Sequence, residues 1–369
     1  MATVIKGGTA YAGVSGEISA HTDEAFSNLF AEVVFDASSA LRALGVKAYN
    51  GRPEQGNVTK TTGKGLTFNK GGLQFSGKIA KTAPSAQLLA KGGNLQATER
   101  DDWVGWAYDW VRLAVALGIP EEDVQDNQGN AQLANLLSDQ MKIGKMGMMD
   151  GLNKLFLGEA TAVSTTIGLP YLISVTQGAG TIGGIAKNSG YWANWVKSVG
   201  SPGGGGDSDK PLNLKRAIVA AQVATSNYAS ANGPDLYISN VGAYLTIARL
   251  GESLEGLLVS NKVYQQFADV GIPHMLLNGQ PIIHDKAATL PWGGTASTDF
   301  IYGVDTTGCG LNFKAAEYLK MEPWEAPRQH DTQRTFRANI FSRVTPYIRD
   351  RRSCFVLHGI TANTEATSD

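Results

Sequence analysis

The sequence has only two cysteines, and charge of neither sign dominates it. Cys309 and Cys354 are too few for a disulfide framework and lack the spacing of a metal site, so we expect two reduced, structural thiols and folding in a reducing cytosol. With 32 basic and 33 acidic residues the net charge is −1. This balance excludes the basic field that drives tight wrapping of nucleic acid by counterion release.

Long apolar runs are also missing. The first twenty residues hold no basic stretch followed by an apolar run of signal-peptide length, so secretion is not indicated. The longest uncharged run, 161–186, has 12 apolar residues among its 26 positions, diluted by five Gly and eight Ser, Thr or Gln, which is too polar for a membrane helix. At 369 residues and 43% apolar content, the chain can bury a large core, and two lobes are expected.

Concentrated chemistry is the third absence. A formal GxGxxG motif, Gly178–Gly183, follows a strand-like segment, which is where a dinucleotide-binding turn would lie. No helical pattern follows it to bind a pyrophosphate, and the next acidic residues, Asp207 and Asp209, lie in a glycine-rich loop. The four glycines at 203–206 lack the Lys-Ser/Thr of a phosphate loop, so they are interpreted as a linker.

Histidines and carboxylates form no recognisable centre either. The five histidines never pair at metal-ligand spacing, and His284 with Asp285 lacks a third ligand. The adjacent carboxylates Asp101-Asp102 and Glu121-Glu122 would splay apart on a helix instead of sharing a proton. We therefore assign no catalytic, cofactor-binding or metal-binding residues, and we expect a structural protein and not an enzyme.

Charge is nevertheless separated into two adjacent blocks. Residues 47–97 hold seven lysines and one arginine against one glutamate, a net charge of +7. Residues 98–126 hold eight acidic residues against two arginines, a net charge of −6. The basic block is rich in Gly, Thr, Lys and Asn, which predicts a long extended hairpin with its turn at Asn69–Gly72. With few large apolar side chains to make it rigid, we expect it to lie on an acidic neighbour.

A long helix is predicted over residues 130–157. Its apolar positions recur at steps of three and four, the period of a helix with one buried face. Gly144, Gly147 and Gly151 weaken such a helix by about 1 kcal/mol each relative to alanine, so we expect another element to pack closely against that side. Its three methionines are interpreted as adaptable core filling: Met146, Met148 and Met149.

Helices and strands follow one another elsewhere without regular β-α-β repetition, so the predicted fold class is α+β. The remaining expectations are an amphipathic helix over about 22–44, strand-like segments at 161–195, 234–240 and 341–360, a flexible loop at 199–211, helices at 214–231, 244–250 and 262–270, and a hairpin at 275–285 across Asn278-Gly279.

Five short motifs follow one another in a recognisable order. They are FLGEATAVSTTIGLPYLIS (156–174), TIGGIAKNSGYWANW (181–195), PDLYISNVGAY (234–244), MLLNGQPIIHD (275–285) and DRRSCFVLHGI (350–360). In number and order they resemble the major capsid proteins of tailed bacteriophages, which have the Hong Kong ninety-seven type fold that encapsulins share.

The resemblance implies a domain organisation. It comprises an N-terminal arm (1–50), an extended β-hairpin loop (51–97), a peripheral domain with a long spine helix (98–165), an axial domain (166–321), return strands of the peripheral domain (322–360) and a flexible C-terminal tail (361–369). In such shells the extended loop lies over a neighbouring subunit, and the segment 287–298 matches a loop at the capsomer axis. Some relatives join Lys to Asn covalently between subunits; the candidates here, by location only, are Lys60, Lys64, Lys70, Lys78 and Lys81.

The function implied is that of a major capsid protein forming hexamers and pentamers, which build an icosahedral head around double-stranded DNA. Further implied partners are a portal protein, a separate scaffolding protein and a decoration protein, with no membrane and no sequence-specific DNA binding. Assembly would occur in the bacterial cytoplasm and the product would be the virion. Many relatives carry a cleaved N-terminal scaffolding segment; none appears here, which fits separate scaffolding or a matured chain. The alternatives are an encapsulin-like cargo shell or, remotely, a nucleotide-binding enzyme using Gly178–Gly183.

Overall fold

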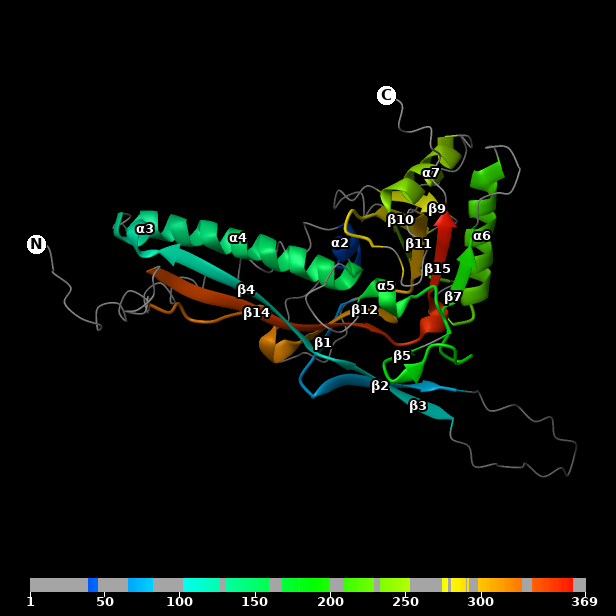
Figure 1. The fold of residues 1–369 in the computed structure, drawn as a ribbon, viewed down its shortest axis with the longest axis horizontal. Coiled ribbons are helices and arrows are strands. Elements are labelled where there is room, and N and C mark those ends of the chain that lie inside the picture. The colour runs from blue at the N-terminus through cyan, green and yellow to red at the C-terminus, as the bar shows by residue number, and fades with distance from the viewer. Residues whose placement is uncertain are drawn as a thin grey trace, which may run out of the picture.

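The computed structural model describes residues 39–45, 66–81, 102–126, 130–158, 168–178, 180–199, 209–228, 233–252, 274–277, 280–289, 291, 298–326 and 334–360. Within these ranges the molecule is elongated, with a long arm at one end and a broader lobe at the other (Figure 1). A five-stranded sheet runs along the arm and a six-stranded sheet forms the lobe. None of the helices in these ranges is long and apolar enough to cross a membrane.

The arm is organised by one long strand, β14 (Thr335–Ile348). Strand β4 (Val111–Pro120) runs antiparallel beside it over ten residue pairs. Towards the lobe, β12 (Cys309–Lys314) continues the pairing with β14 and is itself joined by the parallel strand β1 (Leu66–Asn69). A short strand, β13 (Lys320–Met321), also pairs with β14.

Helix α4 (Asn130–Leu157) lies along the arm and has the bounds predicted from the sequence. Its glycines face β4, where alternate residues Val115 and Leu117 point towards the helix. A Cβ atom on Gly144 would lie 2.6 Å from Leu117 Cδ2. The close packing that the glycines predicted is therefore present, and larger side chains would push helix and sheet apart.

The methionines of α4 do not all fill the core. Met148 and Met149 are buried, as predicted, but the Met146 side chain is 69% exposed. Successive helical residues are rotated by about 100°, so Met146 lies on nearly the opposite side of the helix from Met148. The prediction for Met146 was wrong because all three residues cannot share one face.

The lobe is a mixed sheet with the strand order β7-β15-β11-β8-β10-β9. Strand β11 is antiparallel to both of its neighbours, whereas β7 is parallel to β15 and β8 is parallel to β10. The strands are β7 (Trp195–Ser198), β15 (Phe355–Ile360), β11 (Asp299–Val304), β8 (Leu236–Ser239), β10 (Gln280–His284) and β9 (His274–Leu277).

Each face of this sheet has its own covering. Helices α6 (Asp209–Thr225) and α7 (Val241–Glu252) pack on one face, where they share a hydrophobic cluster with the strands. The other face belongs to the main core, which also includes α2 (Ser39–Gly45). The Ala40 amide in α2 donates to Asp285 Oδ2 at 3.1 Å, so Asp285 at the end of β10 helps to hold this helix.

Several predicted elements are confirmed. The hairpin at 275–285 is formed by β9 and β10, with Leu277 opposite Gln280. Strand β8 and helices α6 and α7 lie within or overlap their predicted ranges. The helix predicted at 262–270 and residues 200–208 of the predicted loop lie outside the described residues, as does the part of the 22–44 helix before Ser39.

The hairpin predicted around Asn69–Gly72 is wrong. Strand β1 pairs with β12, whereas the strand after the turn, β2 (Gln74–Ala80), pairs with β3 (Trp103–Asp109). The physical reason is that Leu66 and Phe68 are needed in the core beside β12, where Phe68 stacks on Phe313 with 5.6 Å between ring centroids. The turn therefore moves the chain from one sheet to another.

The segment 169–172, predicted as strand, forms a short helix, α5 (Leu169–Leu172), with Pro170 in its first turn. Gly168 precedes it with φ of 125°, and a Cβ there would lie 2.8 Å from Leu155 O. The chain must therefore turn sharply against the end of α4, which an extended segment would not do.

The expected boundary at 321/322 cuts across both sheets. Strand β12, expected in the axial domain, belongs to the arm sheet, and β15, expected among the return strands of the peripheral domain, lies inside the lobe sheet. The chain crosses between the sheets more than once, so a division by sequence order could not follow it.

We expect Gly144 and Gly147 of α4 to respond in opposite ways to larger side chains. A Cβ on Gly147 meets only Val115, at 3.4 Å, so Gly147→Ala should raise the free energy of unfolding by about 0.5–1 kcal/mol through helix propensity. Gly144→Leu must displace Leu117 and should lower it by about 1–3 kcal/mol. Denaturant unfolding of the unassembled chain measures both, and similar effects at the two positions would contradict the packing.

Candidate functional site

The antiparallel ribbon of β2 and β3 carries only part of the predicted basic loop, residues 74–80; β1 and Lys70, which also belong to that loop, lie outside the ribbon. The two strands pair over seven residues, from Gln74 opposite Asp109 to Ala80 opposite Trp103. The ribbon extends beyond both main sheets at the lower side of the molecule (Figure 1). The strands that pair are therefore the segments before and after residues 82–101, and the ribbon reaches past residue 97, the expected end of the loop.

One face of the ribbon is anchored by aromatic side chains. The Phe75 ring lies 5.3 Å from that of Trp106 and 5.0 Å from that of Tyr347 in β14, both edge to face. The Ala107 amide donates to the carbonyl of Gly183 at 3.0 Å. The ribbon is thus fixed to the body along one face, so packing sets the direction in which it points.

The opposite face of the ribbon is exposed and carries Ser76, Lys78 and Trp103. The Trp103 side chain is 61% exposed, although an indole has much to gain from burial. Sequence reasoning missed this residue because it lies inside the acidic block, where only the charges were considered. Its one signal is the alternation of DWVGWAYD, in which Trp103 and Trp106 fall on opposite faces.

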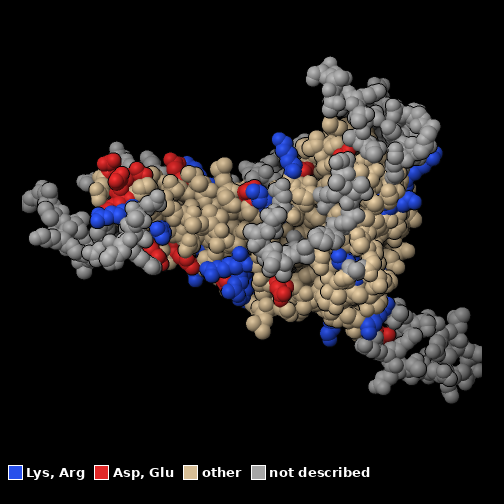
Figure 2. All heavy atoms as spheres, in the orientation of Figure 1, with Lys and Arg blue, Asp and Glu red and all other residues tan. Residues whose placement is uncertain are grey.

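The acidic end of the molecule is α3 (Glu121–Asp126), at the tip of the arm, where acidic side chains gather in Figure 2. Glu121 is buried and lies 3.7 Å from the Arg334 guanidinium, whereas Glu122 and Asp126 are exposed. The pair Glu121-Glu122 therefore splays apart, as expected from adjacent helical positions. Asp101 of the other pair lies outside the described residues.

The structure splits the acidic block of the sequence between two separate places, the ribbon and helix α3. Asp102 and Asp109 of the acidic block lie in the ribbon itself, and the Lys81 amide donates to Asp102 O at 2.7 Å. Helix α3 follows one end of β4, at the tip of the arm, whereas the ribbon adjoins the other end of β4 (Figure 1). Lys60 and Lys64 are outside the described residues. A single chain therefore cannot bring its described ribbon onto its own acidic tip.

The glycine motif at 178–183 serves as a turn. Residues 181–186 form a small hairpin, β5 (Thr181–Ile182) and β6 (Ile185–Ala186). Gly183 and Gly184, with φ of 59° and 84°, occupy the two central positions, which suits the turn of a two-residue hairpin. No helix follows the turn within residues 184–199, so the motif lacks the helix N-terminus that a pyrophosphate site requires.

The other candidate groups are structural. Within the described ranges no three His, Cys, Asp or Glu residues are placed to hold a metal ion. His284 packs against the Tyr244 ring at 4.8 Å, and Asp285 accepts from backbone amides. Cys309 and Cys354 are buried and not disulfide-bonded; the neighbouring Cys354 thiol and burial hold the pKa of Cys309 well above its ordinary value. The raised pKa keeps the Cys309 thiol protonated, which makes it a poor nucleophile.

Arg351, missed by sequence reasoning, lies fully buried where β14 ends and β15 begins. Its guanidinium donates to Leu172 O at 2.8 Å and Ser174 Oγ at 3.3 Å, and makes a short bond to Asn194 Oδ1. More distant contacts reach the carbonyls of residues 187 and 192. Burial lowers the pKa of Arg351 to about 10, so the guanidinium remains charged at neutral pH. The oxygen atoms that accept its hydrogen bonds stabilise this charge in place of a carboxylate.

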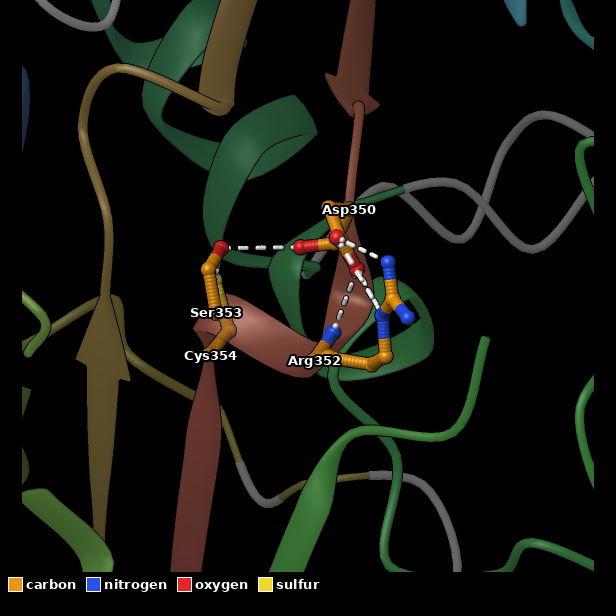
Figure 3. Close-up of polar contacts among 4 residues, drawn as sticks. All are labelled: Asp350, Arg352, Ser353 and Cys354. Carbon is orange, nitrogen blue, oxygen red and sulfur yellow. Dashed lines mark hydrogen bonds and ion pairs between the residues drawn. The ribbon is translucent and has the colours of Figure 1, made fainter. Parts of the chain in front are cut away.

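The turn that presents Arg351 is shaped by its neighbours (Figure 3). Asp350 accepts from the Arg352 backbone amide at 3.0 Å and forms a two-point ion pair with the Arg352 guanidinium, at 3.0 and 2.7 Å. Ser353 Oγ donates to Asp350 O at 2.8 Å. These hydrogen bonds stabilise a tight turn, and none of them joins a nucleophile to a general base.

No protein-family model and no curated protein matches the sequence. Among solved structures, the capsid asymmetric unit of cyanophage A-1(L) matches with a TM-score of 0.54 at 12% identity, covering 80% of this chain and 90% of the other. The native GTA particle capsid matches at 0.49 and 13% identity, with 81% and 88% covered. The holo-SrpI encapsulin of Synechococcus elongatus matches at 0.43 and 10% identity, with 73% and 81% covered.

The chain has the fold of a tailed-phage major capsid protein. It is an α+β fold of the Hong Kong ninety-seven type, as the ordered motifs implied. In this capsid fold the ribbon, the arm with its long helix and the six-stranded lobe are the structural units, and Arg351 lies where they join.

We expect Arg351→Ala to lower the free energy of unfolding by at least about 3 kcal/mol, because it leaves several buried oxygens without a donor. Arg352→Ala, one residue away, removes a partly exposed ion pair with Asp350 and should cost about 1 kcal/mol or less. Chemical denaturation of the two variants beside the unaltered chain measures both. Equal losses would show that Arg351 has no special role in the junction.

Proposed function

We propose that this chain is the major capsid protein of a tailed phage, forming hexamers and pentamers that enclose double-stranded DNA. The observation that carries the proposal is the match along 90% of a cyanophage capsid subunit. The proposed partners are other copies of the chain, a portal protein, a separate scaffolding protein and a decoration protein, with assembly in the host cytoplasm and the virion as product.

The arrangement of the described surfaces supports assembly. The ribbon and the acidic helix α3 lie at different ends of one molecule (Figures 1 and 2), and the ribbon exposes Lys78 and Trp103. Contact between the ribbon of one copy and the acidic arm of the next joins two unlike surfaces head to tail. Such heterologous contacts close into rings when the rotation between copies allows it.

We further propose the arm sheet with α4 as the peripheral domain and the six-stranded lobe as the axial domain, with β12 assigned to the former and β15 to the latter. The ribbon corresponds to the extended loop that reaches a neighbouring copy.

Electron microscopy of the purified, assembled protein tests the proposal. Closed shells tens of nanometres wide are the expected result, and a persistently small oligomer would overturn it. Double-stranded DNA inside particles from lysates distinguishes a phage head from an encapsulin-like cargo shell, which would hold protein.

Reversing the charge of Lys64, Lys70 and Lys78 to Glu should reduce shell yield at least tenfold, because the predicted basic loop of the variant repels the acidic arm of the next copy. The matched Lys→Arg triple variant keeps the charge and should assemble normally. Light scattering follows assembly and circular dichroism checks the fold. Normal assembly of the Glu variant would show that the charge blocks are incidental.

Trp103→Ala should weaken assembly without unfolding the chain, because the side chain is exposed in the isolated molecule and large apolar side chains dominate interface energies. We expect the critical concentration for shell formation to rise at least tenfold. Trp103→Phe keeps a large aromatic side chain at this position, so its critical concentration should stay close to that of the unaltered chain. An unchanged critical concentration for Trp103→Ala would exclude this residue from the interface.

A further inference from the structure

The chain passes between the two sheets at two adjacent turns. Residues 305–308 lead from β11 in the lobe sheet to β12 in the arm sheet, and residues 349–354 lead back from β14 to β15. The turns lie side by side, because the Arg349 amide donates to Gly308 O at 2.7 Å. A Cβ atom on Gly308 would also lie 3.8 Å from Ser353 Oγ. The two turns therefore form one contact between the arm and the lobe.

Each of these turns is followed or ended by a cysteine, and the sequence has no others. Cys309 is the first residue of β12, and Cys354 immediately precedes β15. Both side chains are fully buried, and the two thiols lie within hydrogen-bonding reach of each other. A buried cysteine often serves as a small apolar residue. That role needs neither a second cysteine nor contact between two thiols.

Both turns are held in place by hydrogen bonds of their own. In the first, the amide and hydroxyl of Thr306 donate to the two carboxylate oxygens of Asp235, at 2.8 and 2.7 Å. In the second, the Cys354 amide donates to Arg351 O at 3.1 Å. Two thiols that the folded chain holds together have a high effective concentration for each other. This arrangement favours a bond between them over a bond to a free small thiol.

We propose that Cys309 and Cys354 form a disulfide bond in the folded chain when it meets a low-molecular-weight disulfide, and that this bond fastens the arm sheet to the lobe sheet. A reducing cytosol keeps both thiols free, and oxidising surroundings allow the bond to close. The proposal goes beyond the capsid function and does not depend on it.

The reaction consists of two successive thiol–disulfide exchanges. The Cys354 sulfur loses its proton to solvent and attacks one sulfur of the small disulfide, and a first small thiolate leaves. The Cys309 sulfur then loses its proton and displaces the second small thiolate from the mixed disulfide. The protein gives up two electrons and two protons, and the small disulfide is reduced to two thiols.

The order of the two sulfurs follows from their surroundings. The neighbouring Cys354 thiol and burial raise the pKa of Cys309, so Cys309 keeps its proton until the second exchange. Both sulfurs are fully buried, so the reagent reaches them only when the junction opens locally. We therefore expect the bond to form slowly and then to persist.

Equilibration of the purified chain with mixtures of reduced and oxidised glutathione tests the bond. After acid quenching, denaturation and alkylation with N-ethylmaleimide, mass spectrometry counts the free thiols, because a bridged chain takes up no maleimide. We expect the equilibrium constant for the bond to be at least tenfold larger in the folded chain than in denaturant. A ratio below tenfold, a dominant glutathione adduct or a bond between two chains would each overturn the proposal.

Thermal unfolding shows whether the bond fits the fold. Closing a loop of about 45 residues should raise the midpoint of unfolding by about 5 °C, and a reducing agent should reverse the gain. Cys354→Ser and Cys309→Ala each keep a small side chain but cannot form the bond, so oxidised glutathione should leave their midpoints unchanged.

An unchanged or lower midpoint for the bridged chain would overturn the fastening role, because it would show that the sulfurs meet only by distorting the junction. Neither measurement involves shell formation. Failure of this proposal therefore leaves the capsid function standing, and failure to form shells leaves this proposal standing.

Discussion

The burial of Arg351 is the constraint on which the rest of the structure depends. A guanidinium removed from water needs nearly every donor satisfied, and here the acceptors are Leu172 O, Ser174 Oγ and Asn194 Oδ1. Two of them lie in the segment after α4, and the third precedes β7. Burial lowers the pKa of Lys187 nearby, and the positive charge of Arg351 lowers it further. Movement of any one segment would leave a buried charge poorly solvated.

Three parts of the molecule meet at this junction. From Arg351 the chain runs backward into β14 and the arm, and forward into β15 and the lobe sheet. The ribbon joins at the same place, because the Tyr108 hydroxyl donates to Ile348 O at 2.8 Å. Burial raises the pKa of Tyr108 well above its ordinary value, so that hydroxyl stays protonated and remains a donor. The directions of arm, lobe and ribbon are thus coupled over a few residues of chain.

Sequence reasoning succeeded where a pattern is local. Helix α4 repeats its apolar period over 28 residues, and the hairpin at 275–285 has its turn residues beside its strands. It was wrong where partners are distant: Leu66 pairs with Leu311, so nothing near β1 could exclude a hairpin with β2. Arg351 and Trp103 were missed for related reasons. The role of Arg351 becomes visible only when the distant oxygen atoms that accept its hydrogen bonds are placed around it. The exposure of Trp103 becomes visible only when the packing around its strand is known.

The separation of charge along the sequence suits the head-to-tail contact proposed above. Opposite charges attract over roughly 10 Å at 0.1 M salt, so under that proposal the lysines of the basic loop orient an approaching copy, and added salt screens them. Trp103, which is 61% exposed on the ribbon, acts only at contact, and salts excluded from protein surfaces strengthen apolar association. The proposed contact therefore combines charges that orient a neighbour with an apolar side chain that holds it once it is in place.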